Sequence, residues 1–419
     1  MQKHVFLALI ALLLITVKSY SQSTEIKNSK LTVGGYGEIT YRHFDYSDDF
    51  NRYTYPENFT DKVSRAQTDI PHLVFFLSYD FGDGWKISSE IEFEHGGVGS
   101  EMEIEAEEFG EYEQEVEKGG EVVLEQFWIE KSFSSRFNIR AGHIIVPVGS
   151  ANYKHLPTEY FTVFRPEGES TIIPQTWHEN GISVHGRLRM WDYEFMVVNG
   201  LDVDAFGSAN WVNGGSVSPY EYKLASSMAG AFRINNYSIN GLRLGVSGYA
   251  GNSAGNSLKA DRYDGLDGTV LIGSFDAEYN SQNWIARTCL IYGDLAESAE
   301  ISRINKNLPS AAPSPHTDVA KNAMSVMAEA GYNVMSFFPK SDDPLYLFLH
   351  YTYYNSMQNT VGTMLADARY KRSLYTVGIN YFPIPQIALK AEYSMRTFDK
   401  PYNQENTLSL GVTFSGMFN

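Results

Sequence analysis

The sequence predicts an all-β fold: a transmembrane antiparallel β-barrel of about sixteen strands, with long extracellular loops and short periplasmic turns. Three observations predict it. Apolar and polar residues alternate over successive stretches, the connections between these stretches alternate between long and short, and strand-favouring tyrosine is frequent, at 28 of 419 residues. A period of two places one set of side chains in lipid and the other toward an interior.

The N-terminal segment is expected to be removed before folding. Lys3 and His4 precede an apolar run from Val5 to Val17, and small residues follow it. This pattern is typical of a secretory signal peptide, which we assign to residues 1–22. The run is shorter than the roughly 20 residues of a membrane-spanning helix. Residues 23–419 are therefore expected to form a single barrel domain.

Charge and cysteine content exclude several classes of function. The chain has 33 basic and 50 acidic residues and a formal net charge of −17, so nucleic acid is not an expected partner. Its single cysteine, Cys289, cannot form an intramolecular disulfide. No cofactor is expected.

The alternation is clearest near the C-terminus, where Leu408, Leu410 and Val412 share one face of a strand and small polar residues share the other. A soluble β-sandwich alternates in the same way. The same pattern marks sixteen predicted strands. They span residues 31–45, 69–81, 84–95, 121–133, 136–146, 179–189, 191–199, 226–235, 240–250, 269–279, 283–293, 321–336, 345–355, 371–382, 385–396 and 406–418.

The connection lengths favour the barrel over the sandwich. Long connections are centred on residues 47–67, 96–120, 147–178, 200–225, 251–268, 294–320, 356–370 and 397–405. Short connections, such as Gly82-Asp83 and Ser134-Ser135, lie between them. An even-stranded barrel with both termini in the periplasm has this arrangement.

Aromatic residues lie near the predicted strand ends, where amphipathic rings favour the lipid headgroups. They are Phe81, Trp85, Trp191, Tyr279, Trp284, Tyr353 and Tyr381. The last strand ends on an outward aromatic, Phe418, which resembles the signal that the insertion machinery of bacterial outer membranes reads. The usual signal ends on the aromatic itself, whereas Asn419 follows here. We therefore expect outer-membrane lipid and the barrel-insertion machinery as partners, in the outer membrane of a Gram-negative bacterium.

Several segments resemble the phosphate-selective porin O and P family, especially its porin-like members in Bacteroidetes. The segments are Gly34–Glu38, Val123–Glu130, His155–Tyr160, Phe164–Glu167 and Ile172–Ile182. The resemblance implies a sixteen-stranded barrel, usually a homotrimer, with the third loop (147–178) folded into the lumen as a constriction. It also implies a pore lined by arginine and lysine in the phosphate-selective members.

Four charged residues of the third loop are the predicted pore constriction: Glu159, Arg165, Glu167 and Glu169. Opposed charges at a constriction order water and favour polar solutes. The same residues could instead pair with wall charges and pin the loop, and both roles can hold for one residue.

Alternation assigns nine bases and nine acids to the inward faces of the strands. These predicted pore-lining residues are Glu38, Arg42, Lys86, Glu90, Glu92, Glu130, Arg140, Arg187, Glu194, Arg233, Arg243, Asp276, Glu278, Arg287, Glu329, Lys390, Glu392 and Arg396. The equal numbers depart from the basic lining of the phosphate-selective members. The sequence thus predicts passive diffusion of small polar or ionic solutes rather than a dedicated phosphate channel.

The second long loop is strongly acidic. Residues 94–121 contain eleven glutamates and one base, Lys118. A solvated surface loop explains such a run. The alternative is a loop that gathers divalent cations, because hard cations prefer clustered carboxylates.

No catalytic or metal-binding motif was found, so we expect no enzyme, no catalytic residue and no metal site. The sequence lacks a Gly-x-Ser-x-Gly elbow and a His-Glu-x-x-His motif, and its histidines are scattered. The alternative function is a surface receptor or a docking subunit of an envelope complex without transport activity.

Overall fold

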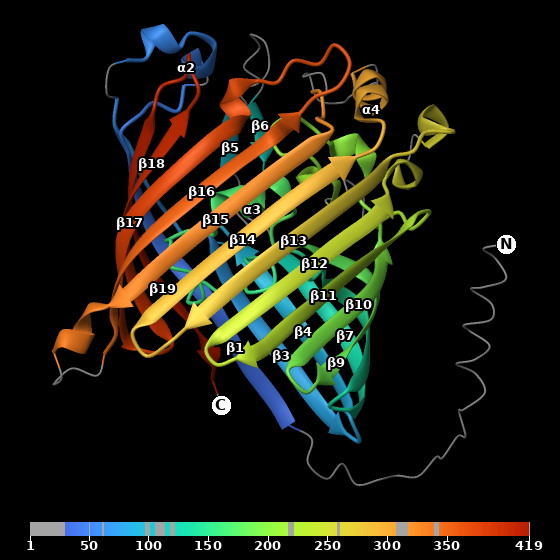
Figure 1. Cartoon of the computed structure of the whole chain (residues 1–419), viewed down its shortest axis with the longest axis vertical. Coiled ribbons are helices and arrows are strands. Elements are labelled where there is room, and N and C mark those ends of the chain that lie inside the picture. The colour runs from blue at the N-terminus through green and yellow to red at the C-terminus, as the bar shows by residue number, and fades with distance from the viewer. Residues whose placement is uncertain are drawn as a thin grey trace.

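A computed structural model describes residues 30–418, except 50, 61–62, 97–100, 105–113, 118–121, 217–221, 258–259, 307–316 and 339–342. The predicted signal peptide lies outside these residues. Sixteen long strands pair antiparallel in chain order, and β1 pairs with both β3 and β19 (Figure 1). These two pairings close the sheet, so the predicted sixteen-stranded antiparallel barrel is confirmed.

The barrel strands coincide with the sixteen predicted ones, and their ends differ by at most four residues. They are β1 (Lys30–Phe44), β3 (His72–Gly82), β4 (Trp85–Glu94), β7 (Val122–Ser134), β8 (Phe137–Ile145), β9 (His178–Leu188), β10 (Trp191–Asn199), β11 (Met228–Ile239), β12 (Leu242–Asn252), β13 (Thr269–Asn280), β14 (Trp284–Leu295), β15 (Asn322–Asn333), β16 (Leu345–Asn359), β17 (Lys371–Ile384), β18 (Ile387–Phe398) and β19 (Glu405–Met417).

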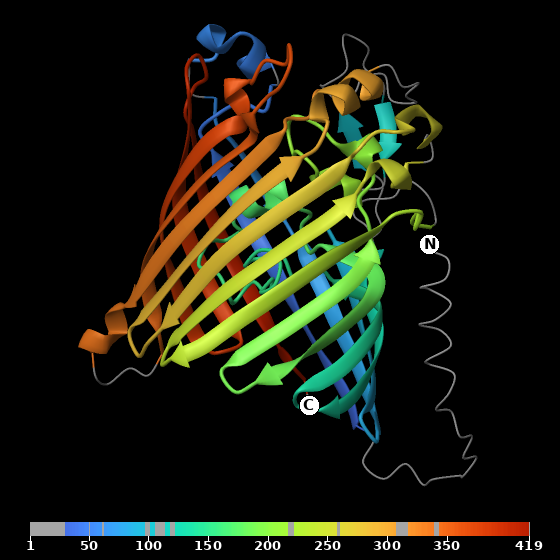
Figure 2. The same cartoon turned by 45° about the vertical axis from the view of Figure 1, so that its right-hand side comes forward.

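Long loops and short turns gather at opposite ends of the barrel (Figures 1 and 2). At the turn end, Gly82, Asp83 and Gly84 all have positive φ, which a tight reversal between twisted strands requires. One strand ends earlier than the predicted 321–336. The side chain of Asn333 accepts a hydrogen bond from the Met335 N–H and begins a short 3-10 helix, η6 (Val334–Phe337).

The loops carry the remaining elements. The short strands are β2 (Arg65–Asp69), which pairs with the loop end of β1, and β5 (Glu101–Ile104) and β6 (Gln114–Glu117), which pair with each other. The α-helices are α2 (Asn51–Thr54), α3 (Glu167–Ile172) and α4 (Ser298–Asn305). Further 3-10 helices are η1 (Pro56–Asn58), η2 (Val203–Ala205), η3 (Asn213–Ser216), η4 (Ala254–Asn256), η5 (Ala260–Tyr263) and η7 (Ala368–Tyr370). Among the described helices, none has the length and apolar composition needed to cross a membrane.

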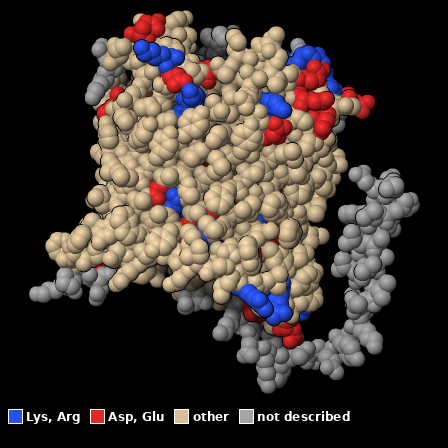
Figure 3. Space-filling view, viewed as in Figure 1, with Lys and Arg blue, Asp and Glu red and all other residues tan. Residues whose placement is uncertain are grey.

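The outer surface of the barrel is apolar between two charged ends. Figure 3 shows Lys, Arg, Asp and Glu gathered at the loop and turn ends, with few charges in the band between them. Outward residues such as Leu349 and Val197 are exposed along this band. Of the predicted aromatic girdle, Phe81, Trp85 and Trp191 are about half exposed. A lipid-facing belt has this pattern.

The interior contains an apolar core on one side, which we call the packed side. There, loop residues pack on the inner face of β8–β15 and include Ile173, Trp177 and Trp211. Trp211 packs directly against Gly293 of β14. Only glycine fits there, since a Cβ at this position would lie 2.0 Å from the indole ring. The rest of the lumen wall, formed by β16–β19, β1, β3, β4 and β7, is lined mainly by polar side chains. We call it the cavity side.

Candidate functional site

The third loop, residues 146–177, lies inside the barrel and crosses the lumen. Figures 1 and 2 show it with α3 behind the front strands. It contacts opposite walls: the Gly149 carbonyl accepts a hydrogen bond from Arg233 of β11, and the Val163 N–H donates to Glu392 of β18. The walls therefore hold the loop from both sides.

Lys390 is the main anchor of the loop on the cavity side. Its ammonium donates to the carbonyl oxygens of Pro157, Tyr160 and Thr162, at 2.6, 2.9 and 2.8 Å. An ammonium has three hydrogens to donate, so all three are used here. This lysine is almost fully buried, and its charge is directed into the loop rather than toward solvent.

Aromatic packing fixes the same stretch of loop. Phe161 stacks on Phe348 of β16 at a centroid distance of 5.2 Å. A Cβ on Gly331 of β15 would lie 2.3 Å from the Phe161 ring, so this close approach requires a glycine. The Phe161 carbonyl also accepts a hydrogen bond from Asn380 of β17.

The predicted constriction residue Glu169 stabilises the loop internally. Its carboxylate accepts hydrogen bonds from the backbone N–H groups of Ser150 and Asn152, at 3.1 and 2.8 Å. Burial raises the pKa of Glu169, and the backbone hydrogen bonds oppose that rise. Glu169 lies outside the cavity lining described below. Glu159 makes no ion pair with another described residue.

Glu167 joins the loop to the wall through charge. Arg396 of β18 lies 2.5 Å from its carboxylate, Arg372 of β17 lies 3.6 Å away, and Tyr354 also donates to it. Burial alone would raise the pKa of Glu167, but the two guanidinium groups lower it to about 2. Glu167 is therefore ionised at neutral pH and helps to pin the loop.

Arg165 extends from the loop toward β1. Its guanidinium donates to the hydroxyl of Tyr36, at 3.3 Å, and to the hydroxyl of Thr176. The neighbouring Phe164 ring lies 3.2 Å below the guanidinium carbon of Arg42, also on β1. Arg42 and Arg165 therefore both lie where the third loop approaches β1.

A cavity of about 300 Å³ lies between the third loop and the cavity side. Its charged lining residues are Glu38, Arg42, Arg165, Glu167, Glu392 and Arg396, together with His72 and His350. A second cavity of about 380 Å³ lies nearer the turn end and is lined by Arg140, Tyr153, His185 and Glu194, among others. Residues of the third loop therefore contribute to the lining of both cavities.

The inward charges of β11–β16 form a continuous series of ion pairs, which we call the charge ladder. In spatial order it comprises Arg233, Asp276, Arg243, Glu278, Arg287, Glu329 and His350. Asp276 lies at 2.6 Å from Arg233 and also contacts Arg243, and Glu329 lies at 2.6 Å from Arg287. Lys154 of the third loop joins the ladder at Glu278, at 2.7 Å. Every carboxylate here has a cationic neighbour.

The inward charges of β1, β4 and β7 are different. Four glutamates, each at most 4% exposed, form what we call the acid cluster: Glu38, Glu90, Glu92 and Glu125. His155 contacts Glu90 at 3.2 Å, and Tyr36 donates to Glu125 at 3.5 Å. None of the four forms an ion pair with a described lysine or arginine. The sequence had not assigned Glu125 to the lumen.

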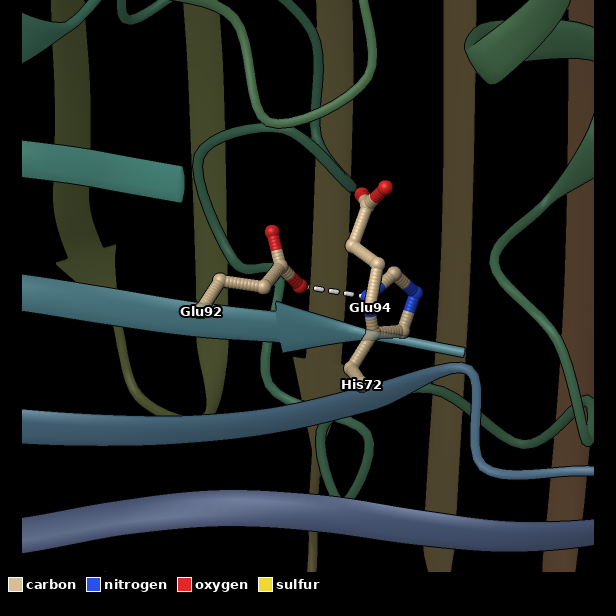
Figure 4. A group of neighbouring side chains, drawn as sticks. All are labelled: His72, Glu92 and Glu94. Atoms are coloured by element: carbon tan, nitrogen blue, oxygen red, sulfur yellow. Dashed lines mark hydrogen bonds and ion pairs between the residues drawn. The ribbon is translucent and has the colours of Figure 1, made fainter. Parts of the chain in front are cut away.

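A second group of side chains lies beside the acid cluster and shares Glu92 with it. The alternation of apolar and polar residues along a single strand does not reveal this group. His72, Glu92 and Glu94 each present a ligand-type atom, and these atoms lie within 4.8 Å of one another (Figure 4). The register pairs His72 with Glu94 directly and places Glu92 opposite Val74. His72 is twenty residues from Glu92 in sequence, so spacing along the chain does not reveal this group.

The other predicted pore-lining residues lie toward the turn end. Arg140 pairs with Glu130 at 2.9 Å and approaches Glu194 at 4.0 Å. Lys86 and Arg187 are exposed there. Most of the acidic second loop lies outside the described residues, so the structure bears only on residues 94–96 and on the β5–β6 pair.

Comparison with known sequences finds a distant relative and no matching family. No protein-family model matches the chain. An uncharacterized protein of Aquifex aeolicus is 27% identical over 375 residues, which cover 87% of this chain and 75% of that protein.

Solved structures resemble the barrel over nearly its whole length. An anion-selective porin from Comamonas acidovorans has a TM-score of 0.55 at 12% identity, with 93% of this chain and 100% of that chain covered. The outer membrane channel DcaP of Acinetobacter baumannii has a TM-score of 0.55 at 12% identity, with coverages of 96% and 100%. OmpF of Salmonella typhi, in complex with daunomycin, has a TM-score of 0.54 at 10% identity, with coverages of 93% and 97%. The chain therefore has the fold of these outer-membrane barrels.

Proposed function

We propose that this chain is a porin of a Gram-negative outer membrane, which allows small polar or ionic solutes to diffuse passively through a water-filled, charge-lined pore. One observation carries the proposal. Inside a closed barrel, the third loop is held by both walls and leaves a polar cavity of about 300 Å³ beside it. A narrowed aqueous passage needs this combination of a rigid wall and a fixed constriction.

The composition of the cavity suggests what would pass. Arg42, Arg165 and Arg396 line it together with Glu38 and Glu392. Charges of both signs at close range exclude apolar solutes, because such solutes would have to displace water that is strongly held by the charges. We assign the constriction to Arg165 and Glu167, while Glu169 acts within the loop.

The proposal includes three finer assignments. The third-loop segments that resemble the phosphate-selective porin O and P family support membership of that family. The similarity of the barrel to porins supports assembly as a homotrimer in the membrane. The exposed, outward Phe418 supports recognition of the last strand by the insertion machinery.

The test is electrical. The purified chain, inserted into a planar bilayer, should give stepwise conductance, and its reversal potential in asymmetric salt should report its ion selectivity. Arg42→Gln and Arg165→Gln should each shift the reversal potential toward cation selectivity, because each removes a positive charge from the cavity lining.

A matched control removes the same charge outside the lumen. Arg303→Gln acts on a side chain of α4 that is 64% exposed, and it should leave the reversal potential unchanged. If the bilayer shows no conductance after insertion of the chain has been verified, the proposed porin function is wrong. If the channel opens but its reversal potential is unchanged in both lumen variants, the assignment of the constriction is wrong.

A further inference from the structure

We propose that His72, Glu92 and Glu94 bind a divalent transition-metal ion of the zinc class on the cavity side of the lumen. The three residues come from two adjacent strands, β3 and β4, whose inward faces bring them together. The proposal concerns ion binding by the barrel wall and does not depend on solute passage.

The geometry already approximates a metal site. The three ligand-type atoms lie within 4.8 Å of one another, and Nδ1 of His72 lies 2.5 Å from a Glu92 oxygen (Figure 4). Zinc bonds to nitrogen and carboxylate oxygen are about 2.0–2.2 Å long, so tetrahedral ligand atoms lie roughly 3.3 Å apart. Small side-chain rotations in His72 and Glu92 would open that space, and a water molecule would supply the fourth ligand.

Glu38 provides an independent observation. Its side chain on β1 is 4% exposed, and its Oε2 atom has no hydrogen-bond partner among the described residues. Its other oxygen lies 3.8 Å from Nε2 of His72, on the side of the ring away from Glu92. A buried carboxylate with one unpartnered oxygen therefore lies beside the second nitrogen of the candidate ligand.

This arrangement matches how proteins orient a metal-binding histidine. When a metal takes one ring nitrogen, the other carries the proton, and a carboxylate usually accepts it. In the absence of a metal, a neutral His72 has one proton for two flanking carboxylates. Metal on Nδ1 removes that conflict, because the proton then belongs on Nε2, facing Glu38.

The donor set selects the class of ion. Calcium and magnesium take oxygen ligands, whereas an imidazole with two carboxylates suits zinc and similar ions. Glu90 and Glu125 place two further carboxyl groups nearby, and a divalent cation favours the ionised form of each. His72 and Glu38 also line the cavity, so an ion can reach the site from the lumen.

Binding can be measured on the intact, purified barrel without any conductance assay. After chelator treatment in detergent, calorimetric titration with zinc chloride should show one saturable site, and magnesium chloride should show none of comparable affinity. His72→Asn and Glu94→Gln should each weaken zinc binding at least about 10-fold, since each removes a ligand. Glu38→Gln should weaken it by about 10-fold or more while leaving the stoichiometry at one, since it orients His72 without binding the ion.

The matched control is His185→Asn, which removes another lumenal histidine beside a carboxylate, Glu130 at 3.4 Å. It should leave zinc affinity unchanged, and so should His143→Asn, from the pair of rings formed by His143 and His178. Heat-modifiable migration on a gel verifies that each variant is folded. The absence of zinc binding at millimolar concentration, or wild-type affinity in both His72→Asn and Glu94→Gln, overturns the proposal. If zinc binding is lost in His143→Asn but not in His72→Asn or Glu94→Gln, the site lies elsewhere and the proposal is also overturned.

Discussion

The packed side and the cavity side of the lumen use charged residues in different ways. On the packed side, the charge ladder alternates in sign, and Asp276 lies between Arg233 and Arg243. On the cavity side, the acid cluster gathers four buried glutamates with two histidines and without an ion pair to a described lysine or arginine.

Equal numbers of acidic and basic residues therefore do not imply that charge is evenly distributed over the lumen wall. Paired charges under a packed loop hold strands together and have no capacity for another ion. Unpaired carboxylates beside a cavity carry an electrostatic cost that a cation can relieve. We therefore expect the ladder to matter for stability and the acid cluster to matter for ions.

The largest expected effect comes from breaking the ladder at Asp276, whose side chain is fully buried. Asp276→Asn leaves the buried guanidiniums of Arg233 and Arg243 without their shared carboxylate. The free energy of unfolding should fall by about 3–5 kcal/mol. Tryptophan fluorescence during urea unfolding of the barrel in lipid vesicles measures it.

Asp192→Asn is the control for that experiment, because its partner Arg187 is 56% exposed. It should cost about 0–1 kcal/mol. Equal losses in the two variants would mean that the ladder contributes no more than a surface pair.

A smaller effect should follow from releasing the loop on the cavity side. Lys390→Met removes three hydrogen bonds to loop carbonyls, and the free energy of unfolding should fall by about 1.5–3 kcal/mol. Single-channel conductance should rise, since Val163 and Glu167 would then be the loop residues that still hydrogen-bond to β18, and the loop would be held less firmly. Lys371→Met, at the loop end of β17, removes a lysine whose side chain is 45% exposed, and it should change neither quantity. Unchanged conductance in Lys390→Met would show that other contacts position the loop.

The smallest effect, and of opposite sign, is expected in the acid cluster. Glu125 accepts a hydrogen bond from the Tyr36 hydroxyl, and Glu125→Gln keeps an acceptor for that bond while it removes a group that can ionise. At pH 8 the free energy of unfolding should stay the same or rise by up to about 1 kcal/mol, as repulsion among the glutamates is reduced. The same urea experiment decides it. A loss comparable to that of Asp276→Asn would make the acid cluster as structural as the ladder.

The strands were predictable because each is long enough for the alternation of apolar and polar residues to be unambiguous. The lengths of the loops then follow from the ends of the strands. A local irregularity explains why Glu125 was missed. A β-bulge between β4 and β7 pairs Glu90 with Gln126 and Ile91 with Leu124, so Glu125 is the extra residue and faces inward. Counting by twos from Glu130 places it outward.

The candidate metal site was missed for a different reason. Its residues belong to two strands, and only the register of β3 with β4 brings His72 beside Glu92 and Glu94. Glu169 shows the limit for loops: its role depends on the backbone of Ser150 and Asn152, which no periodic pattern encodes.

The cavity also has a consequence for the order of assembly. Its lining includes Glu38 and Arg42 of β1 and Thr407 and Ser409 of β19, the strands that meet at the seam between the two ends of the chain. The packed side is built from consecutive hairpins, which form early because their contacts are local in sequence. The two strands of the seam are separated by almost the entire chain. The wall of the cavity is thus complete only after β1 and β19 have paired, which is the last pairing to form.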